Sequence, residues 1–186
     1  MIAFFVSLVS AAVFAVIAYL LPAFGKLFTP IVAALRSLPI LAVTLILLIA
    51  FGAGGAPIVV AFLSLFPMLY TGILAALKGV SQEIIDAGKV FGASVKNSVF
   101  KVYLPLCSPY ILREATAAFS FSLKLVVSAE VVANTAKSLG GMMQEAQAYA
   151  DGLPRLFALV IVTFFVALVL EVVGGFIAER VEKNVK

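Results

Sequence analysis

The sequence predicts an all-α, polytopic membrane helix bundle of about five transmembrane helices, organised as one domain over residues 1–186. Hydrophobic residues make up 64% of the chain and charged residues 12%, whereas a soluble domain has roughly 45–50% and 25%. The mean hydropathy is +1.21. Two long blocks, residues 1–25 and 37–77, contain no charged side chain. Because a water-soluble fold of this size could not bury so much apolar surface, soluble, disordered and coiled-coil classes are excluded.

The two uncharged blocks supply the first membrane spans. A helix needs about 20 apolar residues to cross the hydrocarbon core, and residues 2–22 fill one such span. This stretch lacks the basic start of a signal peptide and is too long for its apolar region, so we expect a retained helix. The second block is too long for one crossing, and helix-breaking residues cluster in its middle: Gly52, Gly54, Gly55 and Pro57. We expect two helices, about 35–51 and 57–77, joined there by a tight turn.

The second half of the chain alternates polar and apolar stretches. Residues 78–107 carry six charged side chains and predict an aqueous segment. A fourth span is expected over about 108–133, followed by a polar connection over 136–154. A fifth span is expected over about 155–177, and a charged tail follows it.

Lys and Arg residues divide unevenly between the two membrane faces of a five-span chain. The connection 23–37, the segment 78–107 and the tail share one face and hold nine of them. The other face holds two, Lys137 and Arg155. The positive-inside rule then places the first face in the cytoplasm, with the N-terminus outside and the C-terminus cytoplasmic.

The segment 78–107 contains a short amphipathic helix, which we expect over about 81–94. Ser81 can cap its start and Gly92 can end it. Apolar or small residues at helical spacing form one face: Ile84, Ala87, Gly88 and Phe91. Physical reasoning leaves two interpretations open, because such a helix can lie on the lipid surface or dock its apolar ridge into a groove on a soluble partner.

The same segment resembles a cytoplasmic motif of permease subunits of ABC importers: Glu-Ala-Ala, three residues, Gly, nine residues, Ile, any residue, Leu-Pro. Here Asp86-Ala87-Gly88 is followed by Gly92 and by Val102-Tyr103-Leu104-Pro105, and every spacing matches. Asp, Gly and Val stand in this chain where the motif has Glu, the second Ala and Ile. Five further segments look like the nitrate/sulfonate/taurine/riboflavin-type permeases: Arg36-Ser37-Leu38-Pro39, Phe51-Gly52, Phe66-Pro67, Ser128-Ala129-Glu130 and Ser138-Leu139-Gly140. Members of that subfamily usually have one more N-terminal helix, and its loss would also place the N-terminus outside.

This resemblance implies a multi-pass permease of a bacterial cell membrane that transports substrate together with three kinds of partner. These are cytoplasmic ABC ATPase subunits, a second permease copy or paralogue, and an extracytoplasmic substrate-binding protein. The helix at 81–94 would be the coupling helix that docks on the ATPase. ATP and Mg²⁺ would bind to that ATPase, with no cofactor in this chain. The resemblance assigns the coupling contact to ten residues: Ile84, Asp86, Ala87, Gly88, Phe91, Gly92, Ala93, Ser94, Leu104 and Pro105.

The residues agree with a protein that is not itself an enzyme. The chain has no His and one Cys, Cys107, so a Ser-His-Asp triad, a His/Cys metal site and a disulfide framework are not expected. The Gly-rich run at 52–55 has no following Lys, unlike a phosphate-binding loop, and we interpret it as a turn. The basic residues are interpreted as a cytoplasmic rim beside membrane lipid, and nucleic acid is not an expected partner.

Charged residues inside spans are costly and often functional. Lys124 and Glu130 are the candidates for the translocation path, although Glu130 could instead cap or pair structurally. Arg113 and Glu114 lie near the cytoplasmic end of their span, where snorkelling or pairing would accommodate them. We expect Glu171 to pair with a basic residue.

A second class of function stays open at this stage. A secondary transporter or channel could use Lys124, Glu130 and Glu171 as a polar path. It would transport without an ATPase partner, and it leaves the spacing of residues 86–105 unexplained.

Overall fold

The computed structural model describes residues 2–80 and 104–185, and these residues form helices without any strand. Four of the helices are long and apolar enough to cross a membrane: α1 (Ile2–Leu20), α3 (Ile40–Lys78), α6 (Leu104–Ala133) and α8 (Leu153–Val185). Two shorter helices, α2 (Pro22–Arg36) and α7 (Leu139–Gln147), complete the described part. The expected all-α membrane helix bundle is therefore confirmed.

Helix α3 is broken at the predicted turn. Gly52 has φ 69° and ψ 176°, in the left-handed region that glycine adopts without a Cβ clash. Helical structure resumes directly after Gly52, so Gly54, Gly55 and Pro57 lie inside the helix rather than in the turn. The part before the break, residues 40–51, is about 18 Å long at 1.5 Å per residue, too short to cross the hydrocarbon core by itself.

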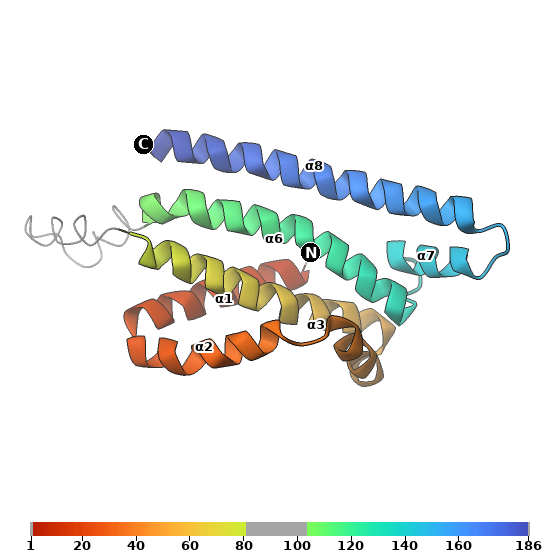
Figure 1. The fold of residues 1–186 in the computed structure, drawn as a ribbon, viewed down its shortest axis with the longest axis horizontal. Coiled ribbons are helices and arrows are strands. Elements are labelled where there is room, and N and C mark those ends of the chain that lie inside the picture. The colour runs from red at the N-terminus through yellow and green to blue at the C-terminus, as the bar shows by residue number, and fades with distance from the viewer. Residues whose placement is uncertain (1, 81–103, 186) are drawn as a thin grey trace, which may run out of the picture.

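The single span expected over 35–51 is therefore wrong. Its first residues end helix α2, and residues 40–51 form a separate short part of α3. The sequence predicted a connection over 23–37, but these residues belong to helix α2, which starts with Pro22 in the first helical turn. Ser37 and Pro39 separate α2 from α3. In Figure 1, α2 runs from the end where α1 finishes toward the middle of the bundle, and the first part of α3 follows the connection, turned aside from the line of the bundle. Two short helical segments thus stand where one span over 35–51 was expected.

The core lies where α3 packs against α1 and α6. Helix α1 presents buried alanines to this contact, among them Ala11 and Ala15, both fully buried. Small residues let helix backbones approach closely in a membrane protein. Rings join α2 to the same core, because Phe28 stacks on Phe14 at 5.1 Å and meets Tyr70 edge-on at 5.4 Å. Helix α2 is thereby held against both neighbours.

The two ends of the bundle differ in charge. In Figure 1, the α1–α2 turn, the end of α3, the start of α6 and the C-terminus lie at one end, and α7 with its flanking loops lies at the other. The first end therefore collects the basic residues at the end of α3 and in the last turns of α8, including Lys78 and Lys183. Among the described residues, Lys78 and Lys183 thus lie at the same end, whereas Arg36 lies in the last turn of α2, toward the middle of the bundle.

Candidate functional site

One face of α6 carries a line of exposed side chains along most of the helix. They recur every three or four residues, which places them on the same face. We call this set the α6 stripe: Tyr110, Arg113, Ala117, Phe121, Lys124 and Ser128. Four of the six are polar or charged. The exposed residues of α8 between 156 and 177 are, by contrast, almost all apolar, as expected for a lipid-facing helix.

Three cavities in the described part of the chain open onto the α6 stripe, one after another. A cavity of about 720 Å³ between the last turns of α3 and the first turns of α6 is lined by Tyr110, Arg113 and Ala117. A second, of about 240 Å³, includes Phe121. A third, of about 240 Å³, is lined by Lys124 and Ser128 together with α7 and α8. The stripe is therefore bordered by open space from one end of α6 toward the other.

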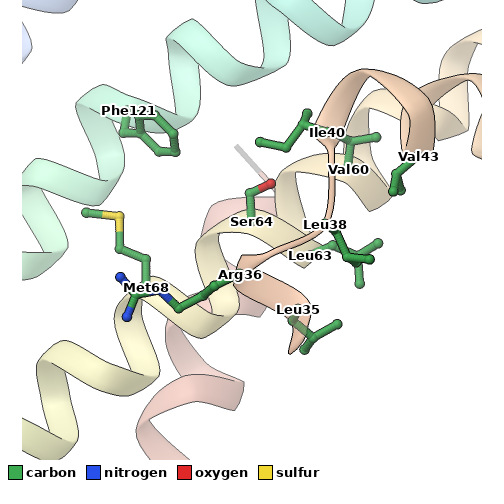
Figure 2. Close-up of a pocket in the computed structure, with 10 residues that line it drawn as sticks. All are labelled: Leu35, Arg36, Leu38, Ile40, Val43, Val60, Leu63, Ser64, Met68 and Phe121. Atoms are coloured by element: carbon green, nitrogen blue, oxygen red, sulfur yellow. The ribbon is translucent and has the colours of Figure 1, made fainter. Parts of the chain in front are cut away.

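The middle cavity lies beside residues 37–39, which connect α2 to α3 (Figure 2). Its walls come from the last turn of α2, from the α2–α3 connection, from α3 and from Phe121 on α6. In the view of Figure 2 the Arg36 side chain runs in the direction of Met68, and both residues line this cavity. Met68 lies closer than Ser64 to the Lys78 end of α3, so the charge of Arg36 is carried toward the basic end of the bundle.

Lys124 and Glu171 form an ion pair between α6 and α8. The Lys124 Nζ lies 3.4 Å from Glu171 Oε2, and the two side chains are 52% and 58% exposed. The Ser120 hydroxyl donates to the Ala167 carbonyl oxygen at 3.0 Å and lies 3.4 Å from the same carboxylate oxygen. The sequence predicted a basic partner for Glu171, and the structure identifies it as Lys124, one of the two residues predicted for the path.

Glu130 holds the start of α7. Its Oε2 accepts the Gly140 backbone N–H at 3.1 Å, and the Ser138 hydroxyl accepts the Gly141 N–H at 3.0 Å. Both contacts satisfy N–H groups that the first turn of a helix leaves free. The Thr135 hydroxyl donates to the Ala53 carbonyl oxygen at 2.7 Å, beside the break in α3. The predicted capping role of Glu130 thus has a geometric basis, and α7 is tied to two membrane helices.

Replacing Gly140 with alanine should loosen α7. A Cβ at this position would lie 2.4 Å from Glu130 Cβ and 2.5 Å from the Val127 oxygen and the Val131 nitrogen. Since backbone atoms cannot move aside as a flexible side chain can, we expect a loss of about 1–3 kcal/mol in unfolding free energy, measured by thermal unfolding in detergent. Gly175→Ala is the control, because its Cβ would meet nothing within 4 Å and should not destabilise α8. Equal stability of the two variants would contradict the packing described.

The sequence matches a family of known role. Residues 2–186 match the family described as the binding-protein-dependent transport system inner membrane component. The chain belongs to this family. It is therefore a permease component of an ABC importer, in the inner membrane, as its resemblance to these permeases implied. Comparison with curated proteins gives no match.

In this permease the predicted coupling helix, residues 81–94, lies outside the described residues, so the placement of Ile84 to Ser94 stays a prediction. Helix α6 begins at Leu104, and Pro105 lies in its first turn, where a missing N–H costs little. Close by, the Cys107 thiol donates to the Ala76 carbonyl oxygen at 3.4 Å. Glu114 packs so tightly on α3 that a Cβ on Gly72 would lie 2.3 Å from its Cγ. The two helices that flank the coupling segment are thus in direct contact.

Lys124 and Glu130 could be predicted as site residues from the sequence, but other residues of the site were not predicted. Tyr110 and Phe121 were not predicted as functional residues, Ser128 appeared only in the family-like segment Ser128-Ala129-Glu130, and Arg36 was expected in a connection. The available signal was the helical spacing of two polar pairs, Tyr110 with Arg113 and Lys124 with Ser128. This signal was missed because Arg113 and Lys124 were interpreted separately and not as members of one helix face.

Proposed function

We propose that this permease component pairs with a second permease copy or paralogue, and that the α6 stripe lines the substrate path between them. The observation that carries the proposal is the polar stripe with cavities along its length. Lipid is a poor environment for exposed Arg and Lys side chains in the middle of a span. A water-filled path would solvate the half-exposed Lys124 and Glu171. Lys124 is then a path residue and Glu171 its partner.

The coupling to ATP hydrolysis is assigned to the segment between α3 and α6. In this proposal, residues 81–94 dock on a cytoplasmic ABC ATPase, which holds ATP and Mg²⁺. This chain supplies no catalytic group. Because α3 and α6 pack along each other and flank the segment, a push on it displaces both helices together. Nucleotide-driven closure of the ATPases would thus be converted into rigid-body motion of the bundle that opens or closes the path.

The proposed orientation follows from the basic end of the bundle. Lys78, Arg180 and Lys183 would lie in the cytoplasm, with the N-terminus outside and α7 facing the extracytoplasmic binding protein. The contacts of Glu130 and Thr135 would then hold α7 as a fixed docking surface at the outer mouth of the path.

Cysteine accessibility tests the path directly. In a Cys107→Ser background, we expect Ala117→Cys and Ser128→Cys on the stripe to react with a membrane-impermeant thiol reagent applied from both sides. Val162→Cys and Val173→Cys, exposed on α8, are the matched controls. A thiol needs water to ionise and react, so the stripe positions should react roughly tenfold faster or more. The experiment uses the assembled transporter in membrane vesicles.

The result that would contradict the path assignment is equal reactivity of the two helices. Slow reaction at all four positions would place the α6 stripe against lipid or a dry protein surface. Fast reaction on α8 alone would move the path to the other side of the bundle.

A further inference from the structure

A cavity of about 500 Å³ between α2 and α3 stands apart from the α6 stripe. Its two charged lining residues are both basic, Arg36 from the end of α2 and Lys78 from the end of α3. Both are exposed. In the described part of the chain no Asp or Glu lines this cavity, and neither basic residue takes part in an ion pair. The cavity therefore presents uncompensated positive charge.

The remaining walls combine apolar surface with hydroxyl groups. Val32 and Leu74 form buried apolar wall, and Tyr70, 1% exposed, lines the same space. Among the described residues the Tyr70 hydroxyl has no hydrogen bond of ordinary length and angle. The Thr29 hydroxyl beside it donates to the Gly25 carbonyl oxygen at 2.7 Å. The hydroxyl groups of Tyr70 and Thr29 therefore lie together in the wall of the cavity.

We propose that this cavity binds the phosphate headgroup of an anionic phospholipid. Arg and Lys side chains are strong donors to phosphate oxygens, and basic pockets between membrane helices bind acidic headgroups. The apolar walls suit the acyl part of the phospholipid, which extends from the headgroup into the membrane. Arg36 lines both this cavity and the middle cavity of Figure 2, and Lys78 lines this one. The proposal depends only on the membrane location of the chain, and it stands or falls separately from the path assigned to α6.

Native mass spectrometry of the transporter, titrated with phosphatidylglycerol or phosphatidylcholine, tests this site. We expect tighter binding of phosphatidylglycerol to the wild type. Removing either charge, by Arg36→Gln or Lys78→Gln, should weaken that binding about fivefold, and removing both about 25-fold. Lys26→Gln is the matched control, because Lys26 is an exposed base on α2 that does not line the cavity. Arg36→Lys combined with Lys78→Arg keeps both charges and should keep binding within a factor of about two.

Two outcomes would overturn the proposal. One is unchanged phosphatidylglycerol binding in the double Gln variant, once thermal unfolding shows that it is folded. The other is binding of inorganic phosphate in place of the lipid, with displacement of phosphatidylglycerol at millimolar phosphate, which would make the cavity a site for the free ion.

Discussion

Replacing Gly92 with arginine should abolish ATP-driven uptake while the chain still inserts into the membrane. Gly92 lies in the segment that matches the coupling motif, six residues after Asp86. Glycine allows close approach of a helix backbone to its partner, and an arginine there would hold the helix off its groove or bury an unpaired charge. We expect the contact with the ATPase to weaken by about 2 kcal/mol or more, roughly thirtyfold in affinity. Uptake into proteoliposomes with and without ATP measures the effect.

Asn97→Arg is the matched control for this substitution. Asn97 lies in the same segment, between Gly92 and Val102, where the motif allows any residue. It should therefore transport at close to the wild-type rate. Normal uptake by Gly92→Arg, or equal loss in both variants, would contradict the coupling assignment.

Reversing the charge of Lys124 should give the second large effect. Lys124→Glu places a carboxylate beside Glu171, where the structure has an attraction across 3.4 Å. Both side chains are about half exposed, so solvent weakens the attraction between them. The strength of this ion pair therefore depends on the environment inside the path. We expect the initial rate of uptake to fall at least about tenfold, equivalent to about 1.4 kcal/mol, because the sign of the stripe's charge is changed within the path.

A charge swap separates the path role of Lys124 from its packing role. Lys124→Glu combined with Glu171→Lys restores an ion pair and should recover the thermal stability of the wild type. Uptake should stay low if the cation must lie on the α6 stripe, and its full recovery would contradict a path role for Lys124. Arg155→Glu is the control substitution. Arg155 lies 3.7 Å from Glu145 in an exposed ion pair at the α7 end of the bundle. It should change stability by about 1 kcal/mol or less.

The membrane class, the break at Gly52 and the placement of Lys78 and Lys183 at one end of the bundle could all be predicted from the sequence. Each depends on a local property: the run of uncharged residues, the conformational freedom of glycine, and the order of charges along the chain. Helix α2 was not predicted, because Lys26 and Arg36 made its stretch look like a loop. In the fold, Arg36 extends along α3 and Lys26 is exposed at the start of α2, so neither charge prevents the helix.

Contacts between distant residues could not be derived in the same way. The partner of Glu171 lies 47 positions away, and the Thr135 hydroxyl reaches a carbonyl 82 positions away. Sequence spacing alone does not say how α6 rotates against α8, and that rotation decides whether Lys124 faces lipid, protein or water. The capping role of Glu130 was closer to prediction, since Gly140 follows only ten residues later.

The central claim is that this permease component couples to an ABC ATPase through residues 81–94. Extraction from native membranes in a gentle detergent, followed by mass spectrometry of the copurifying proteins, tests it most directly. We predict that an ATPase with a phosphate-binding Gly-x-x-x-x-Gly-Lys-Ser/Thr loop copurifies with the wild type and with Asn97→Arg, and is lost with Gly92→Arg. Recovery of the wild-type chain alone, or only with copies of itself, would contradict the claim.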